Sequence, residues 1–407
     1  MSPRGTFSRL SAWLVVGLCF LALALVFSAR AGLGLVMPVW VRELGWTKSF
    51  ISGAGAAALI VMACVAPVAG RLVDRHGPRM VLAIGLVAVG LGAMIIATAS
   101  SQPMFVFGFS LVSAIGFGAS GSAVVSTSVA RLFEENRGLA IGIATSGATA
   151  GQFVIVPLIA FLLTTMSWRW SFLLLAAGCL LLVPVLWSFL DRPSEVNKAA
   201  NAQSQPSDIR TEVGELLRRP VFHALFWSFF LCGYTTTGII ETHLIPYSAF
   251  CGFPPLPSAT AYGVLSAVNF GGMILSGWLA DRVHRPTLLA SIYFLRGLTF
   301  LILMNVGTNY ETLLLFAAAF GVVDYSTVPI TASLVASHLG IERMGLAAGL
   351  ISAGHAVGGS LGAFIGGYLF DATASYGLVW WSGVWLAFVA AVLVLPLGER
   401  QAELKTA

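Results

Sequence analysis

Charged side chains stand inside several apolar stretches of this 407-residue chain. Arg30 lies between LALALVFSA and AGLGLVM, Glu241 follows TTGII, and Asp324 follows AAAFGVV. A charge near the centre of a bilayer costs about 2.5–3.5 kcal/mol on insertion scales, so each of these residues needs a partner or a function. A guanidinium offers a permanent charge and a planar fork of donors that fits a carboxylate. Arg30 is therefore a candidate for binding an anion, with a structural pair to a neighbouring helix as the alternative.

Glu241 is the matching acidic candidate. It shares one helical face with Tyr234, Thr237 and Gly238, which precede it by seven, four and three residues. We expect Glu241 either to close an outer gate with Arg30 or to carry a transported proton. His243 lies two residues further on, about 200° around the helix, so it cannot face the same ligand. A structural or interfacial role is the alternative for His243.

Asp324 and Arg296 stand at mid-depth in neighbouring apolar stretches. An arginine that faced lipid would be costly, so we expect Arg296 to point inward and to pair with Asp324. This pair either fixes the packing of the two helices or opens when a substrate anion or a proton arrives. Both residues are candidates for the substrate site.

The elements that position these residues are predicted to be membrane-spanning helices. The chain is 57% hydrophobic and 10% charged, with a mean hydropathy of +0.89, whereas soluble domains carry about 25% charged residues. Apolar stretches recur at about the length of twenty residues that crosses a bilayer. They lie near residues 11–38, 49–70, 80–99, 104–130, 138–165, 170–190, 222–249, 260–280, 287–306, 311–337, 345–370 and 377–397.

A polar stretch divides the twelve spans into two sets of six. We predict an N-terminal six-helix bundle over 1–190, a cytoplasmic linker over 191–220 and a C-terminal six-helix bundle over 221–407. The linker ends in a short predicted surface helix, Thr211–Arg219. Seventeen of the 22 Lys and Arg residues fall on the side of the termini and the linker, which predicts that this side is cytoplasmic in a cell inner membrane.

An internal repeat supports two similar halves. GRLVDR (70–75) and GWLADR (277–282) are 207 residues apart, and GLAIGIATSGATAGQ (138–152) aligns with GLAAGLISAGHAVGG (345–359) at the same offset. Such a repeat indicates the duplication of a six-span unit. His355 replaces Ala148 of the first copy, at mid-depth. A histidine can change charge near neutral pH, so His355 is a site candidate, with a hydrogen-bonded packing role as the alternative.

The segment GRLVDRHGPR (70–79) resembles the loop motif between spans two and three of the major facilitator superfamily, and 277–285 resembles its second copy. GWTKSFIS (45–52) and Pro67 are similar to the monocarboxylate and oxalate/formate branch. The resemblance implies an all-α polytopic fold of two pseudo-symmetric six-helix bundles, in which spans 1, 4, 7 and 10 line a central cavity. We expect four residues to gate the cytoplasmic side, where the two carboxylates meet basic residues and helix N-termini. They are Asp74, Arg75, Asp281 and Arg282.

One departure from that branch affects the substrate site. Its carriers place an Asp and an Arg in span eight, where the Arg binds the substrate carboxylate. Span eight here, AYGVLSAVNFGGMILSGWLA, carries no charge before Asp281, and only Asn269 and Met273 lie near those positions. Arg30, or less directly Arg296, must then supply the charge for an anion.

No enzyme or cofactor chemistry is predicted. The sequence lacks G-x-x-x-x-G-K-[ST], its five cysteines are scattered, and no catalytic or metal-ligand spacing appears. The basic residues follow the topology, so no nucleic-acid partner is expected. We expect a monomer in the lipid bilayer, with no cofactor and no metal.

The favoured function is a secondary transporter for a small organic anion, similar to a monocarboxylate, driven by proton symport or by exchange. One alternative is an efflux pump for amphiphilic compounds, although span five lacks the G-x-x-x-G-P-x-x-G-G run of such antiporters. Another is a carrier for an aromatic, vitamin-like nutrient, stacked by Trp40, Tyr234 and Tyr325. A transport-inactive sensor is the alternative outside transport.

Overall fold

The computed structural model describes residues 4–190 and 208–399, and every regular element in these ranges is helical. Eleven helical runs are long and apolar enough to cross a membrane. A twelfth is formed by α11 (Pro220–Gly233), the π-helical segment η2 (Tyr234–Ile240) and α12 (Glu241–Phe250), which follow one another without a break. The predicted all-helical fold with twelve spans is confirmed.

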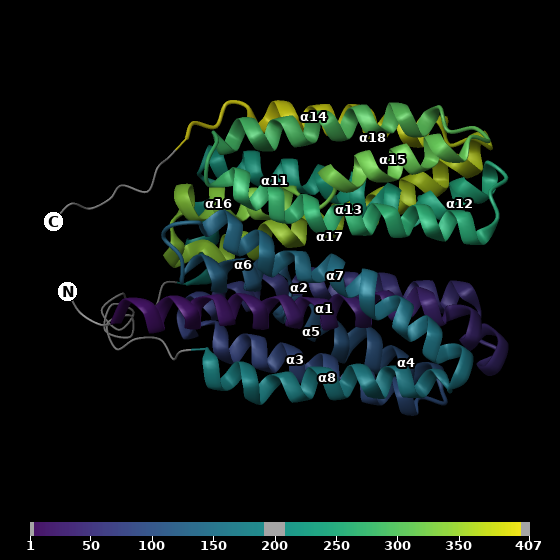
Figure 1. Cartoon of the computed structure of the whole chain (residues 1–407), viewed down its shortest axis with the longest axis horizontal. Coiled ribbons are helices and arrows are strands. Elements are labelled where there is room, and N and C mark those ends of the chain that lie inside the picture. The colour runs from purple at the N-terminus through teal and green to yellow at the C-terminus, as the bar shows by residue number, and fades with distance from the viewer. Residues whose placement is uncertain (1–3, 191–207, 400–407) are drawn as a thin grey trace.

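The first six spans lie together in one bundle (Figure 1). They are α1 (Arg4–Leu44), α2 (Lys48–His76), α3 (Pro78–Thr98), the run of α4 (Gln102–Val106), η1 (Phe107–Ser113), α5 (Ala114–Ala119) and α6 (Ser122–Ala130), then α7 (Arg137–Thr165) and α8 (Trp168–Phe189). The first helix passes Pro38, where span one was predicted to end, and reaches Leu44. A proline removes one N–H without forcing a membrane helix to stop, because neighbouring helices satisfy the freed backbone group.

The other six spans form a second bundle beside the first, as Figure 1 shows. After the run α11–η2–α12 come α13 (Pro255–Ala280), α14 (Arg285–Met304), α15 (Tyr310–Val323), α16 (Thr327–Leu339), the short η3 (Ile341–Arg343), α17 (Met344–Thr373) and α18 (Gly377–Val394). Span ten is therefore two helices, α15 and α16, separated at 324–326. Pro329 explains the interruption, because its ring conflicts with the carbonyl of Tyr325, four residues earlier.

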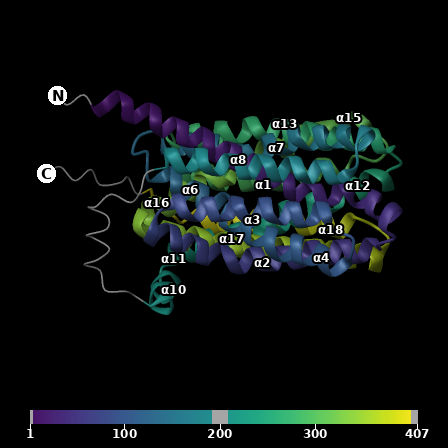
Figure 2. The same cartoon turned by 90° about the horizontal axis from the view of Figure 1, so that it is seen from below.

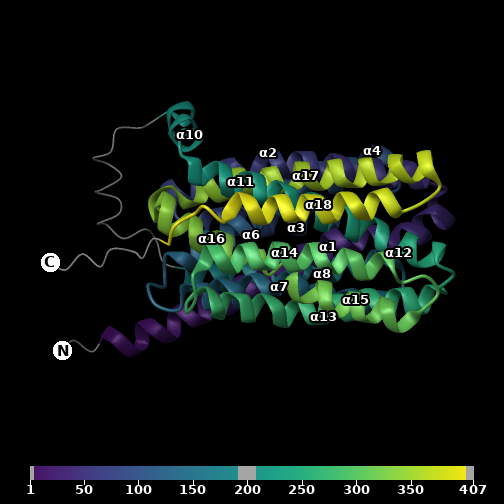
Figure 3. The same ribbon diagram turned by 90° about the horizontal axis from the view of Figure 1, so that it is seen from above.

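Both ends of the described chain lie at the same end of the molecule, which we call the terminal end (Figure 1). The short helix α10 (Ile209–Leu217) also lies there, set apart from the spans (Figures 2 and 3). Asp208 caps this helix by accepting from the Arg210 backbone N–H. It matches the surface helix predicted at 211–219, shifted by two residues. Residues 191–207 of the predicted linker lie outside the described residues.

The turn between α2 and α3 shows how the loop motif folds. Gly77 has φ +80°, a left-handed conformation that glycine adopts without steric cost, and its N–H donates to the Val73 carbonyl to end α2. Pro78 follows as the first residue of α3, where its missing N–H is not needed. The sharp turn leaves Asp74 and Arg75 on the last turn of α2, at the terminal end.

Large aromatic side chains fill the end of the first bundle that is opposite the terminal end. The Trp40 ring is fully buried and packs against Trp46, Phe105, Trp168 and Phe172, with ring centroids 4.8–6.3 Å apart. Trp40 therefore belongs to the core of this bundle and is not free to stack on a ligand, which corrects the expectation for an aromatic nutrient carrier.

Candidate functional site

A cavity of about 120 Å³ lies between the two bundles. The first bundle contributes α1, α2, α5 and α6 to its wall, and the second contributes α11, η2, α16 and α17. Most of the wall is apolar, and Arg30 is its one permanently charged member among the described residues. The other polar members are hydroxyl-bearing residues and a histidine. They are Ser122, Ser126, Thr237, Tyr325, Thr331, Ser352 and His355.

Arg30 in the cavity wall meets Glu241, which belongs to the other bundle and lies behind the wall residue Tyr325. The Arg30 Nη2 atom lies 3.8 Å from Glu241 Oε2, and the Tyr325 hydroxyl donates to Glu241 Oε1 over 2.6 Å. The guanidinium also lies over the Phe27 ring, 4.8 Å from its centroid, where the ring face attracts a cation. The side chains of Arg30 and Glu241 are 23% and 19% exposed, and of the two only Arg30 lines the cavity, where a ligand can reach it. The structure brings together the anion candidate, the acidic candidate and Tyr325.

Arg296 points inward, as expected, but it does not form the predicted side-chain pair with Asp324. Its guanidinium donates to the backbone carbonyls of Val323 and Asp324, to the Cys232 Sγ atom at 2.9 Å and to Thr235. These carbonyls are left free because span ten breaks. The Val328 N–H donates to the Tyr325 carbonyl, whereas in an unbroken α-helix it would donate to the Asp324 carbonyl. The sequence prediction assumed an unbroken helix, in which those carbonyls are already satisfied and only the carboxylate remains for Arg296.

The Asp324 side chain is held by a neutral partner. Its Oδ2 atom accepts from the Asn269 amide over 3.0 Å, while its Oδ1 atom has no hydrogen-bond partner in the described part of the chain. The Asn269 carbonyl oxygen in turn accepts from the Tyr325 N–H, so Asn269 fixes the break in span ten. Asp324 is 3% exposed and is not part of the cavity wall. The Asp324 carboxyl group therefore bonds to a neutral amide and not to the Arg296 side chain.

The remaining predicted site residues occupy different places. His355 lies in the cavity wall, with its ring 4.8 Å from that of Phe229. Tyr234 is buried outside the wall, and its hydroxyl pairs with Ser382 of α18 at 3.1 Å. Of the predicted stripe on span seven, Thr237 reaches the cavity. His243 contacts the Ala363 carbonyl at 3.1 Å.

The two motif carboxylates join the bundles at the terminal end. Asp74 on α2 accepts from the backbone N–H groups of Gly345 and Leu346 at 2.9 and 2.8 Å, at the start of α17. Asp281 at the end of α13 accepts from Gly138 and Leu139 at 2.7 and 2.8 Å, at the start of α7. Free N–H groups and the positive end of the helix dipole favour a carboxylate at both places.

Arginines around Asp74 complete this contact. Arg131 donates to the Asp74 carboxylate over 2.5 Å and to the Val73 carbonyl, and burial lowers the pKa of Arg131 while the carboxylate opposes that shift. Arg75 pairs with Glu212 of α10 at 3.0 Å. Arg282 instead donates to the Trp278 carbonyl and lies over that ring. Arg131 was not among the predicted site residues. Its position directly after span four, at the cytoplasmic side where the motif carboxylates were predicted to meet basic residues, was a usable signal.

Close backbone contact seals the same end. A Cβ atom added at Gly70 would overlap the Gly345 carbonyl, and one added at Gly138 would lie 2.5 Å from the Gly277 carbonyl oxygen. Small residues permit helices to approach in this way. The cavity is therefore closed toward the terminal end in this structure.

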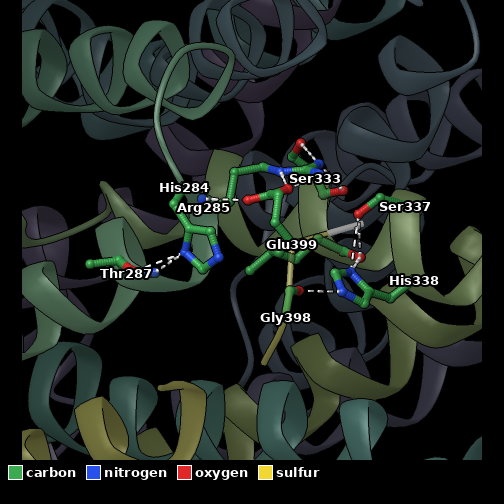
Figure 4. Close-up of polar contacts among 9 residues, drawn as sticks. His284, Arg285, Thr287, Ser333, Ser337, His338, Gly398 and Glu399 are labelled. Atoms are coloured by element: carbon green, nitrogen blue, oxygen red, sulfur yellow. Dashed lines mark hydrogen bonds and ion pairs between the residues drawn. The ribbon is translucent and has the colours of Figure 1, made fainter. Parts of the chain in front are cut away.

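A second polar network holds the last described residues, as Figure 4 shows. Arg285 forms an ion pair with Glu399 and donates to the Ser333 hydroxyl at 3.1 Å. The His338 ring contacts the Gly398 carbonyl at 2.9 Å. These contacts lie within the second bundle and do not involve the cavity wall.

Comparison with known proteins connects this geometry to a family. The model of the Major Facilitator Superfamily matches residues 19–309 and 273–407. The chain is 28% identical to monocarboxylate transporter 13 of Rattus norvegicus over 368 residues, covering 89% of this chain and 83% of that protein. It is 28% identical to monocarboxylate transporter 11 of Mus musculus, with coverage of 89% and 82%.

Solved structures share the fold. The proton:xylose symporter XylE gives a TM-score of 0.74 at 16% identity, covering 95% of this chain and 96% of that one. The Escherichia coli fucose:proton symporter FucP gives 0.73 at 18% identity, covering 94% and 98%. Since the family match spans both bundles and the relatives are named as transporters, not enzymes, the chain belongs to the Major Facilitator Superfamily of multi-pass membrane transporters.

Proposed function

We propose that the chain carries a small organic anion, similar to a monocarboxylate, across the cell inner membrane together with a proton. The observation that carries this proposal is the Arg30–Glu241 pair at the cavity. Arg30 is the permanent cation available in the wall, and its fork of donors fits a carboxylate. The names of the relatives support a monocarboxylate, and those of two structural neighbours support proton coupling.

The pair also suggests how anion and proton are linked. A carboxylate that binds Arg30 competes with Glu241 for the same guanidinium. Glu241 would then be a partly buried carboxylate without its cation, a state that protonation relieves. Anion and proton thus favour each other's binding, and both leave when the cavity opens to the other side. Asp324, already held by a neutral partner, is the second candidate for the coupled proton.

Transport follows from rocking of the two halves. Residues 1–190 and 221–407 act as two bodies joined by the linker 191–220, and the protein works as a monomer. The concentration of Lys and Arg at the terminal end supports a cytoplasmic location for that end. The closed contacts of Asp74 and Asp281 then belong to a state sealed on the cytoplasmic side, and Arg75 and Arg282 flank that seal.

The test is counterflow of labelled benzoate, used as a probe monocarboxylate, into proteoliposomes. We expect saturable counterflow with the unaltered protein and its loss with Arg30→Ala. Arg42→Ala is the matched control, since Arg42 lies on the same helix but its side chain is 76% exposed. Counterflow at normal rates with Arg30→Ala, or its absence with the unaltered protein, would contradict the proposal.

A further inference from the structure

Two buried hydroxyl groups in the cavity wall lack hydrogen-bond partners among the described residues. Ser126 on α6 and Thr331 on α16 are 2% and 4% exposed, and neither oxygen is bonded. A buried hydroxyl without a partner costs about 1–3 kcal/mol. Three buried serines elsewhere share this state but lie outside the wall. They are Ser28, Ser120 and Ser171.

The two hydroxyls approach the cavity from opposite bundles at a similar depth. At the repeat offset of 207 residues, the position equivalent to Ser126 in the second half is residue 333, two positions from Thr331. Thr331 lies six residues beyond Tyr325, whose hydroxyl bonds to Glu241. Thr331 therefore lies further toward the terminal end than the break at 324–326 that carries Tyr325.

Most of the remaining wall is apolar and partly aromatic. It includes Phe27, Met62, Phe117 and Val328. The cavity volume of about 120 Å³ is of the order of an apolar cavity that binds one benzene ring, roughly 150 Å³. No lysine or arginine other than Arg30 lies in the described wall, so a second carboxylate would find no cation.

We propose that Ser126 and Thr331 form a second polar subsite, which binds a hydroxyl or carbonyl oxygen at the far end of the substrate. The preferred substrate is then a monocarboxylate with a compact apolar body, such as one ring, and a polar oxygen opposite the carboxylate. This inference rests on the proposed function, because Arg30 holds the carboxylate end. Both oxygen atoms are buried in this structure, so a change of χ1 rotamer turns each hydroxyl toward such a ligand, which supplies the partner that both lack.

The test is competition against labelled benzoate counterflow by benzoate, 4-methylbenzoate and 4-hydroxybenzoate. We expect 4-hydroxybenzoate to inhibit at a concentration roughly tenfold lower than the other two, the gain of one or two net hydrogen bonds. The methyl compound controls for size. The double variant Ser126→Ala/Thr331→Val should lose this preference, so that 4-hydroxybenzoate and 4-methylbenzoate inhibit it at similar concentrations.

Neighbouring residues provide a matched control. Thr127 and Ser128 are buried on the same helix, lie outside the wall, and donate to carbonyls of their own helix. Thr127→Val/Ser128→Ala should therefore keep the preference for the hydroxyl compound.

Two results would overturn the inference alone: equal inhibition by the three compounds in the unaltered protein, or an unchanged preference in the Ser126/Thr331 variant. The first needs no variant, so poor folding of the double variant does not protect the inference. Absence of saturable benzoate counterflow in the unaltered protein would instead overturn the proposed function, and this inference with it.

Discussion

Arg30 and Glu241 balance each other's charge in a place that is only partly open to water. Removing one partner leaves the other as an unpaired charge, which by itself can damage a protein. Loss of transport in a single variant therefore does not separate a ligand contact from a structural pair. Removing both partners does, because no charge is then left unpaired.

We expect Arg30→Ala/Glu241→Ala to remain as inactive in benzoate counterflow as Arg30→Ala alone. The reason is that the anion still lacks its cation, although the unpaired carboxylate is gone. Arg30→Lys should keep weak counterflow with reduced apparent affinity, because an ammonium lacks the bidentate fork. Recovery of counterflow in the double variant would make the pair structural and would exclude Arg30 as the anion ligand.

Arg296 has a different role, since it satisfies backbone carbonyls where span ten breaks. Arg296→Met should lower the thermal unfolding midpoint in detergent, because each unpaired buried carbonyl costs about 1–3 kcal/mol. Arg282→Met is the control, since Arg282 lies at the terminal end and contacts only its own helix in the described structure. Equal midpoints for the two variants would show that water replaces the guanidinium at no cost.

At this scale the sequence predicted which side chains matter better than it predicted their partners. Glu241 was predicted to close a gate with Arg30 as one of two roles, and the two side chains do meet. The partners of Arg296 depend on carbonyls freed by a helix break, and backbone groups have no signature in residue type. Tyr234 was predicted from helical spacing, but the π-helical turn at 234–240 changes which residues share a face.

Among the elements, α2 and α17 carry the contact that closes the terminal end. Asp74→Asn keeps the size of the side chain but removes the charge that faces Arg131 and two helix N–H groups. We expect a lower transport rate with nearly unchanged affinity, measured by counterflow over a range of benzoate concentrations. Asp371→Asn on the exposed far turn of α17 is the control. Full turnover of Asp74→Asn would remove the gating role.

The short helix α10 contacts both halves next to that closure. Glu212 pairs with Arg71 of α2 at 2.8 Å, and Glu215 pairs with Arg343, directly before α17. Only the Glu215–Arg343 pair is exposed, whereas the Glu212 and Arg71 side chains are 14% and 20% exposed, so Glu212→Gln/Glu215→Gln should raise opening of the terminal end severalfold. The opening is measured as the rate at which an impermeant maleimide, added on the side of the terminal end, labels Ala66→Cys. An unchanged labelling rate would show that α10 does not restrain opening.

The spans themselves were predictable because lipid leaves the backbone few options. A chain without water must bond its own amides, so long apolar stretches become helices and their lengths follow the bilayer. The break at 324–326 was missed, although Pro329 was its local signal. Mean hydropathy over a window of about twenty residues does not register a single proline, so it indicates the same span whether or not the helix breaks there.

For the whole molecule, the two bundles enclose a cavity that is sealed at the terminal end by backbone contacts, and its wall contains Arg30, which pairs with Glu241 of the other bundle. A carrier with this arrangement changes access when the halves rock about the cavity. In the proposed mechanism the proton site and the anion site share one cation, Arg30, which lies 3.8 Å from Glu241.

The most direct test compares two transport modes of Glu241→Gln with those of the unaltered protein, using labelled benzoate in proteoliposomes. Exchange of benzoate between equal internal and external concentrations needs no net proton movement. Accumulation of benzoate driven by an imposed pH gradient needs a proton to move with each anion. We predict that Glu241→Gln retains exchange and loses gradient-driven accumulation, because the amide cannot take up the proton that accompanies the anion. Accumulation by Glu241→Gln equal to that of the unaltered protein would contradict the account.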